Sequence, residues 1–492
     1  MKISFWGIFI VFGLLLASSS CKKEIPLAPG ILTFSADSVI FDTIFTNLPS
    51  PSARLYLYNN SNQDILIENI RITGGAQSEF TLTFDGVAAQ EHHQYKLRAK
   101  DSVLALINFT SQVKDQATID YLVVSSGSFS QTIPLYAFVF DGIYIRGAEA
   151  QSVIDGDTIN GLYTVGCGIN NDTIFYNSKK IVIDGPVYVE PGCTLRIRGG
   201  TQVYFTARRT SDNYPTSFLL IGGTLLVEGS SGDQRVWFTG TRQGKDYAEK
   251  SGQWQGVIFL KTSEGNDLRN LVIKNASVGI RVDSISPTED NKPKVYLKNC
   301  EIRNMANFAV LGLGFSHTFR QQPTIVAENC LFSNAGNNVV GFFGGGKYSL
   351  VNCSAIGSGT EFIRRGATLG WNNYHTVTKE SFPSDITILN TIIWGNNPQN
   401  EEIGTDLRDG TTDTLKVSYS LVRSSLVKPG NGNILNLDPQ LENVSEKKFN
   451  LKANSPAINA GTTLFGITPF DDITGQTRSD GLIDIGAFEY RP

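Results

Sequence analysis

The chain has 492 residues, which is too long for one ordinary compact core and implies several domains or a solenoid. Charged residues make up only 18%, while the 48 glycines, together with many Asn, Ser and Thr residues, are typical of an all-β protein. The net charge of −4, with no Lys/Arg block longer than a pair, excludes the basic footprint of a nucleic-acid-binding protein.

The N-terminus, "MKISFWGIFIVFGLLLASSSCKKE", has one Lys, an apolar run from Ile3 to Ala17 and three serines before Cys21. The run is too short for a stable membrane span and is typical of a signal peptide. Small residues before Cys21 resemble the lipobox of bacterial lipoproteins, and "CKKE" resembles the export signals of Bacteroidetes surface lipoproteins. This resemblance implies a signal peptide over 1–20, acylation (palmitate included) of Cys21 and an outer-membrane location, with the membrane face left open. An ordinary secretory signal with an incidental cysteine is the alternative.

After a lipid-anchored linker over 21–30, residues 31–141 contain short alternating strands separated by turns. In "ARLYLYNNSNQ", for example, Leu55 and Leu57 alternate with Tyr56 and Tyr58 before an Asn-Asn turn. Short strands at this spacing predict a β-sandwich, which is similar to immunoglobulin-like modules.

From 142 to 454 the rhythm changes to pairs of apolar residues two positions apart, such as Ile181/Ile183 and Val187/Val189, with tight Gly- and Pro-containing turns between them. Short strands that turn repeatedly around one narrow core predict a parallel β-helix. Asparagine marks its period, in "NLVIKN", "NCEIRN", "NCLFSN", "NCSAIG" and "NTIIWG", which begin at positions 270, 299, 329, 352 and 390.

The apolar phase slips by one residue at each of these asparagines, so the chain bends there and starts a new strand facing the same interior. Asparagine tolerates the left-handed backbone that such a bend needs, and its amide can bond to the copies in neighbouring coils. The positions that follow, Leu271, Cys300, Cys330, Cys353 and Thr391, should therefore form one internal file.

The three cysteines of this file are predicted to be small core residues rather than metal ligands or nucleophiles. The chain has no CxxC motif with a His-rich companion, so no metal site is predicted. Cys167 and Cys193 lie near the start of the coils, and whether they form a disulfide is left open.

The C-terminal segment, 455–492, closely resembles the ending of right-handed parallel β-helix proteins of the pectin-lyase-like superfamily. The matching residues are Ser455-Pro456-Ala457, Ala460-Gly461, Asp472, Gly475, Arg478 and Asp484-Ile485-Gly486-Ala487-Phe488-Glu489. We expect this segment to cap the open end of the solenoid, with Arg478 and Asp484 forming an ion pair or turn contacts.

Enzymes of this fold use paired carboxylates for hydrolysis, or a basic residue with a charge neutraliser, often calcium, for β-elimination. Two loops carry suitable residues. "EEIGTDLRDG" offers Glu401, Glu402, Asp406 and Asp409, as a calcium- or sugar-binding loop or simply as an exposed acidic loop. Residues 361–383 gather the candidate ligand-binding set: Arg364, Arg365, Trp371, Tyr374 and His375. Aromatic rings stack on sugars and guanidinium groups bind carboxylates, but the same residues can pack over the solenoid wall.

The sequence thus predicts an all-β chain: an immunoglobulin-like β-sandwich followed by a right-handed parallel β-helix with a C-terminal cap. The favoured function is non-catalytic binding of a polysaccharide or another envelope protein, with no cofactor beyond the calcium just mentioned. A polysaccharide lyase or glycoside hydrolase acting on acidic glycans is the alternative, and adhesin-like assembly is a third hypothesis that no motif supports.

Overall fold

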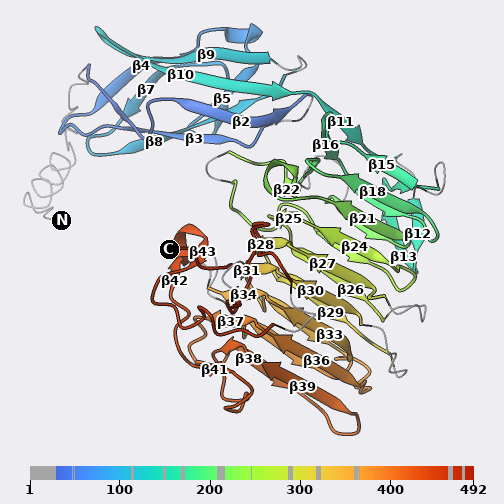
Figure 1. The fold of residues 1–492 in the computed structure, drawn as a ribbon. Coiled ribbons are helices and arrows are strands. Elements are labelled where there is room, and N and C mark those ends of the chain that lie inside the picture. The colour runs from blue at the N-terminus through green and yellow to red at the C-terminus, as the bar shows by residue number, and fades with distance from the viewer. Residues whose placement is uncertain are drawn as a thin grey trace, which may run out of the picture. The chain divides into compact units, whose positions relative to one another are not determined.

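The computed structural model describes residues 29–492 apart from 47, 49, 112–115, 148–150, 168–171, 208–215, 245–246, 286–291, 317–322, 359–363, 365, 464–468 and 479–481. The described chain is built from strands, with short 3-10 turns at η1 (Gly75–Gln77), η3 (Gly232–Gln234) and η4 (Val444–Glu446). It divides into two compact units between Val139 and Phe140 (Figure 1). Among the described residues, no helix has the length and apolar character that crossing a membrane requires.

The first unit is a sandwich of two five-stranded sheets whose inward-facing side chains form one core. One sheet has the order β1 (Thr33–Phe34), β3 (Ala53–Tyr58), β8 (Ser102–Phe109), β5 (Phe80–Phe84) and β6 (Val87–Ala88). The other has the order β2 (Val39–Phe45), β10 (Phe129–Phe140), β9 (Gln116–Ser126), β4 (Ile65–Ile72) and β7 (Glu91–Leu97).

The second unit is a right-handed parallel β-helix with three sheets, each named here by its first strand. The β11 sheet contains β11 (Gly142–Ile145), β16 (Lys180–Ile183), β19 (Gln202–Phe205), β22 (Val236–Gly240), β25 (Leu271–Lys274), β28 (Glu301–Met305), β31 (Leu331–Ala335), β34 (Ser354–Gly357), β37 (Ile392–Gly395), β40 (Leu421–Val422) and β41 (Ile434–Leu435). The β14 sheet contains β14 (Tyr163–Val165), β17 (Pro186–Val189), β20 (Phe218–Ile221), β23 (Val257–Phe259), β26 (Val278–Asp283), β29 (Phe308–Leu313), β32 (Val340–Phe343), β35 (Leu369–Asn372) and β38 (Ile403–Asp406). The β15 sheet contains β15 (Asp172–Phe175), β18 (Thr194–Arg198), β21 (Thr224–Glu228), β24 (Asn266–Arg269), β27 (Val295–Lys298), β30 (Ile325–Glu328), β33 (Gly346–Val351), β36 (Ser384–Leu389) and β39 (Asp413–Ser418).

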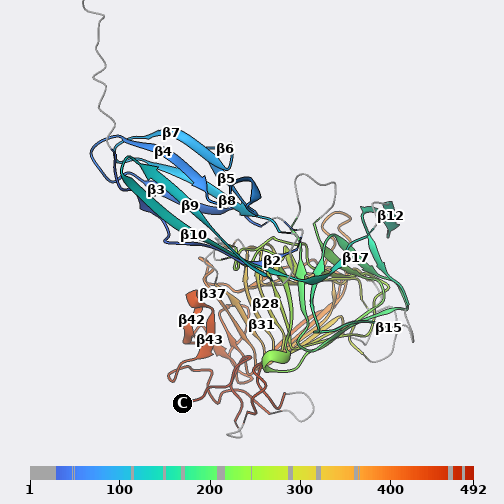
Figure 2. The ribbon, with the colours of Figure 1, turned by 90° about the horizontal axis from the view of Figure 1, so that it is seen from above.

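Figure 2 shows these sheets as three walls, with β28 and β31 in one, β17 in the second and β15 in the third. Two antiparallel hairpins, β12 (Gln151–Ile154) with β13 (Asp157–Asn160) and β42 (Leu441–Asn443) with β43 (Lys448–Leu451), complete the fold. The strand pairing confirms the predicted fold class of a sandwich followed by a β-helix.

The repeated asparagines make the corners between the β15 and β11 sheets. All five have left-handed backbones with φ between 48° and 55°, as predicted (Asn270, Asn299, Asn329, Asn352 and Asn390). The predicted stacking of amides is seen in two pairs. Asn329 Nδ2 donates to Asn299 Oδ1 at 3.2 Å, and Asn390 Nδ2 donates to Asn352 Oδ1 at 3.2 Å.

The residues after these asparagines form the predicted internal file. Their successors Val272, Glu301, Leu331, Ser354 and Ile392 are consecutive register partners. The file itself, Leu271, Cys300, Cys330, Cys353 and Thr391, is fully buried. The three thiols are free and fully buried, so they pack in the core as small apolar side chains, as predicted. Cys167 and Cys193, which the sequence left open, form a disulfide.

The C-terminal segment covers the solenoid, but in a different place from the one predicted. The open end is closed by 423–435, where Val427 is buried in the solenoid core and Ser425 N donates to Glu401 Oε2 at 2.9 Å. The described residues of 455–492 lie instead along the outer face of the β11 sheet (Figure 1). That face has apolar residues pointing outward, and the segment buries them: Leu331, Ile356, Ile392 and Leu421 pack against Ala457, Ile473, Ile485 and Ala487.

Arg478 fixes this segment to the asparagine corners. Its guanidinium is buried, donates to Asn329 Oδ1 at 3.1 Å and pairs with Glu489 at 2.6 Å. Asp484 was the predicted ion partner, but its carboxylate accepts the backbone N–H of Asn459 at 2.7 Å and makes the turn contacts that were the other prediction. These side chains are therefore structural.

Candidate functional site

Of the five residues predicted to bind a ligand, the structure describes four, and it separates Arg364 and Trp371 from Tyr374 and His375. Arg364 is buried and donates to both carboxylate oxygens of Glu402, at 2.9 and 2.6 Å. Glu402 is fully buried and also accepts the backbone N–H and the hydroxyl of Thr368 at 2.9 and 2.8 Å. Arg364 and Glu402 thus form a closed internal pair that is not available to a ligand, and Arg365 lies outside the described residues.

Trp371 also belongs to the solenoid core. It lies on β35 with 5% of its surface exposed, and its indole Nε1 donates to Ser384 Oγ at 2.9 Å. Trp371 therefore packs in the solenoid wall, which was the alternative to ligand binding that the sequence left open.

Tyr374 and His375 remain at the surface, on the loop that joins β35 to β36. The Tyr374 hydroxyl donates to Asp406, and this hydrogen bond raises the pKa of Tyr374. Arg408 lies over the same ring, 4.3 Å from its centroid. The His375 ring meets Phe315 edge-on at 4.7 Å and accepts the Thr378 N–H on Nδ1 at 3.1 Å.

A second loop, 407–412, runs beside the first and is held to it by Asn373. The Asn373 amide accepts the Arg408 N–H at 2.8 Å and donates to the Arg408 carbonyl at 2.8 Å. Two chain segments about 35 residues apart in sequence are therefore fixed as one unit at the edge of the β15 sheet.

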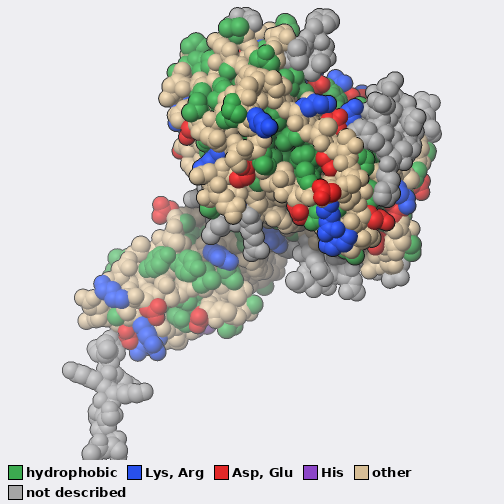
Figure 3. Space-filling view, turned by 90° about the horizontal axis from the view of Figure 1, so that it is seen from below, with side chains coloured by type: hydrophobic (Ala, Val, Ile, Leu, Met, Phe, Trp, Pro, Cys, Tyr) green, Lys and Arg blue, Asp and Glu red, His purple; other side chains and the backbone are tan. Residues whose placement is uncertain are grey.

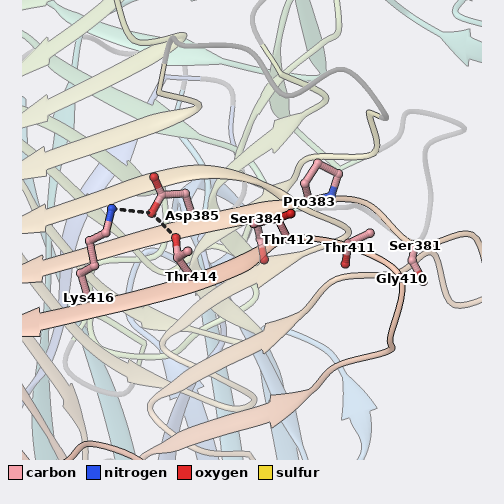
Figure 4. Close-up of a pocket in the computed structure, with 9 residues that line it drawn as sticks. All are labelled: Ser381, Pro383, Ser384, Asp385, Gly410, Thr411, Thr412, Thr414 and Lys416. Atoms are coloured by element: carbon pink, nitrogen blue, oxygen red, sulfur yellow. Dashed lines mark hydrogen bonds and ion pairs between the residues drawn. The ribbon is translucent and has the colours of Figure 1, made fainter.

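These loops and the starts of β36 and β39 enclose a hollow of about 600 Å³, shown in Figure 4. Asp385, Thr414 and Lys416 lie together at one end, and Ser381, Gly410 and Thr411 lie at the other. Five of its lining residues carry hydroxyl groups: Ser381, Ser384, Thr411, Thr412 and Thr414.

The charged groups of the hollow are paired with each other. Lys416 Nζ is 3.8 Å from Asp385 Oδ1, which also accepts the Thr414 hydroxyl at 2.5 Å. Asp385 is the one acid among the lining residues that the structure describes, whereas hydrolysis of a glycosidic bond requires two carboxyl groups. The arrangement is suited to holding a polar ligand.

The hydroxyls of Ser384, Thr411 and Thr414 form the floor of the hollow, and Asp413 orients two of them. Its Oδ1 accepts from the backbone N–H of Ser384 at 3.1 Å and from the Ser384 hydroxyl at 2.5 Å. Its Oδ2 accepts from the hydroxyl of Thr411 at 2.7 Å and from Asn373 Nδ2 at 2.6 Å. The Ser384 and Thr411 hydroxyls therefore have fixed orientations before any ligand binds.

Sequence reasoning missed this floor, although a signal for it was present. In "SDITIL" and "DTLKVS" the inward residues alternate with Asp385, Thr387, Thr414 and Lys416, so period two already placed these on the outer face. The two-residue period could not predict the hydrogen bonds of Asn373 between the two loops, which bring 381–385 and 410–416 together.

Other predicted features give no second site. Among the described residues, no group of three or more His, Cys, Asp or Glu side chains is placed to hold a metal ion. On the face of the solenoid seen in Figure 3, Lys/Arg and Asp/Glu side chains lie next to one another rather than in large areas of one sign. Cys21, the predicted acylation site, lies outside the described residues.

No protein-family model matches the chain, and no curated protein matches it. Among solved structures, it is similar to the catalytic unit of a thermostable GH87 α-1,3-glucanase from Streptomyces thermodiastaticus strain HF3-3, with 11% identity, a TM-score of 0.28, and coverage of 81% of this chain and 82% of that one. It is also similar to an ASH/PapD-like domain (PapD-like domain 7) of human CEP192, with 10% identity, a TM-score of 0.18, and coverage of 24% of this chain and 92% of that one. Both likenesses are too distant to carry an argument, so the description of the fold rests on the strand pairing itself.

Proposed function

We propose that the chain is a lipid-anchored protein of the bacterial outer membrane whose β-helix binds a polysaccharide without cleaving it. The observation that carries the binding role is the hydroxyl-lined hollow between 381–385 and 410–416, which is preformed and polar. Concave sites with a few fixed polar groups are the usual form of small-ligand and saccharide sites. The anchor rests on the lipobox-like residues before Cys21.

Non-catalytic binding is favoured over cleavage because the charged lining residues, Asp385 and Lys416, are paired with each other. The neighbouring Asp413 already accepts four hydrogen bonds within the protein. A hydrolase needs a second carboxyl group beside the bond to be cleaved, and a lyase needs a free base close to the sugar. Arg364 and Glu402, which could have contributed to such chemistry, bind each other inside the solenoid.

Binding is tested with the purified soluble chain by affinity electrophoresis against a panel of plant and bacterial polysaccharides, neutral and acidic. We expect retardation by at least one polysaccharide, weaker retardation for Thr414→Val, and neither new reducing ends nor the ultraviolet absorbance of unsaturated uronates. Retardation by none of them would disprove the binding role. Release of products by the wild type that is lost in Asp385→Asn would replace it with catalysis.

The anchor is tested separately by metabolic labelling with a fatty acid in a bacterial host that processes lipoproteins. We expect label on the wild type and none on Cys21→Ser. Label retained by the variant would exclude Cys21 as the acylated residue. Protease treatment of intact cells then shows which face of the membrane the chain occupies.

A further inference from the structure

The three hydroxyl groups in the floor of the hollow already donate their protons in hydrogen bonds within the protein. Carboxylates can only accept hydrogen bonds, so each hydroxyl that touches one must be the donor. Ser384 and Thr411 donate to Asp413 at 2.5 and 2.7 Å, and Thr414 donates to Asp385 at 2.5 Å. A hydroxyl has one proton, so these three present only lone pairs to a ligand.

The remaining contacts fix these hydroxyls further. Ser384 Oγ accepts from the Trp371 indole at 2.9 Å, and Thr411 Oγ1 accepts from Asn373 Nδ2 at 2.8 Å. Indole and amide N–H groups can only donate, so the direction of both bonds is also settled. Reversing any one hydroxyl would break its hydrogen bond to a carboxylate and place two lone pairs against each other. The floor therefore stays a set of acceptors when a ligand binds.

The carboxylates that hold these hydroxyls point the same way. Asp413 accepts from Ser384 and Thr411, and Asp385 accepts from Thr414. Lys416 is paired with Asp385 at 3.8 Å, and Lys347 is the register partner of Asp385 on β33. A carboxylate or phosphate of a ligand that reached the three hydroxyls would therefore meet lone pairs next to carboxylates. A sugar hydroxyl would instead donate its proton to a fixed acceptor.

We infer that the hollow is specific for a neutral, hydroxyl-bearing glycan and discriminates against acidic ones. This inference rests on the proposed polysaccharide binding and changes the ligand class that the sequence suggested, because the arginine expected to recognise uronates, Arg364, is paired internally. An extended peptide fits less well, because half of its backbone polar groups are carbonyls that cannot donate, whereas every sugar hydroxyl can turn its proton toward an acceptor.

The test uses polysaccharide pairs that differ at C6, where one has a hydroxymethyl group and the other a carboxylate. Suitable pairs are a galactan with a polygalacturonan and a glucan with a polyglucuronan. Dissociation constants are measured by affinity electrophoresis with the full mature chain, and binding of an extended peptide library is measured in parallel. We expect the neutral member of at least one pair to bind ten-fold or more tightly than its acidic partner.

Two variants and one control connect the preference to the floor. Thr414→Val removes an acceptor and should weaken binding of the neutral glycan about five-fold. Asp385→Asn removes a negative charge and should narrow the difference between neutral and acidic partners. Ser349→Ala, on the neighbouring strand β33 and next to Thr387 rather than to a lining residue, should leave both constants unchanged. All three should retain the unfolding midpoint of the wild type, because the changes are at the surface.

The outcomes separate this inference from the proposed function. Tighter binding of an acidic partner, or no effect of Asp385→Asn on the preference, would overturn the inference and leave polysaccharide binding standing. Binding of the peptides in preference to every glycan, or of no glycan at all, would overturn both.

Discussion

At the scale of single residues, the asparagine corners show how a backbone requirement fixes a repeat. A left-handed conformation costs most residues about 1–2 kcal/mol, and asparagine tolerates it better than they do. Asn390 adds a second contribution, because its amide donates to Asn352 Oδ1 at 3.2 Å and to the Thr462 carbonyl at 2.8 Å. The backbone and the side chain both favour asparagine there.

Two substitutions at this corner separate these contributions. Asn390→Gly keeps the left-handed backbone and loses the amide, whereas Asn390→Ala loses both. We expect the alanine variant to be the less stable of the two by about 1 kcal/mol in chemical denaturation. Equal midpoints for the two variants would show that the backbone conformation contributes nothing.

Lys294 gives the solenoid a pH dependence of known sign. It is fully buried, its ammonium donates to the Asp283 carbonyl at 2.5 Å, and burial lowers its pKa to about 7 from an ordinary 10.5. Between these values the unfolded chain binds a proton that the folded chain does not, so folding becomes more favourable as pH rises from about 7 to 10.5.

We therefore expect the stability of the wild type relative to Lys294→Met to increase between pH 7 and 10 and to be constant below pH 7. The slope is at most about 1.4 kcal/mol per pH unit, the value for one proton. Denaturation midpoints of both chains across this range measure it. A difference that does not change with pH would mean that Lys294 stays protonated in the folded state.

At the scale of elements, the segment 455–492 explains why one outer face of the solenoid is apolar. Its Arg478–Glu489 pair is almost completely buried, with 2% and 5% of the side chains exposed. Burial raises the pKa of Glu489, and the nearby Asp484 charge raises it further, against the opposing charge of Arg478. The ionised pair is therefore costly to keep and depends on both partners.

Removing one partner should release the segment. We expect Arg478→Met to cost about 3–5 kcal/mol and to expose 455–492 to protease, because a buried carboxylate is left alone. The double variant Arg478→Met/Glu489→Leu should recover much of this loss. If it is no more stable than the single variant, the pair is not what makes the substitution costly.

The period of the coils could be predicted from the sequence, because period two and the asparagine corners are local signals. The cysteine file followed from the same reasoning. The path of 455–492 could not be predicted from local signals. Leu331 and Ile392 face outward and are covered by Ile485 and Ala487, which come more than 90 residues later in the chain. The hollow was missed for the same reason, since a contact between loops brings its two halves together.

At the scale of the whole molecule, each coil of the β-helix packs on its neighbours only, so a local change should have a local effect. The Cys167–Cys193 disulfide joins positions 26 residues apart at the first coils. A cross-link of this length contributes about 3 kcal/mol in the chain-entropy account.

Replacing both cysteines by alanine should therefore loosen the first coils only. Hydrogen exchange should speed up in β14 and β17 and remain unchanged in β34 to β37. The reduced wild type should behave in the same way. Loss of protection along the whole solenoid would show that the unit unfolds as one block.

The course of the C-terminal segment has a consequence for how this protein can evolve. It touches the coils at separate heights: Gly486 N bonds to Asn390 O at 2.8 Å, Arg478 bonds to Asn329, and Gly475 lies against Ser231. The segment therefore has a fixed length relative to the stack of coils. Duplicating one repeat, the ordinary way in which solenoids grow, would move these contact points apart by about 4.8 Å if the new repeat fell between Ser231 and Asn390. Insertion of a repeat within this span should therefore break at least one of the contacts.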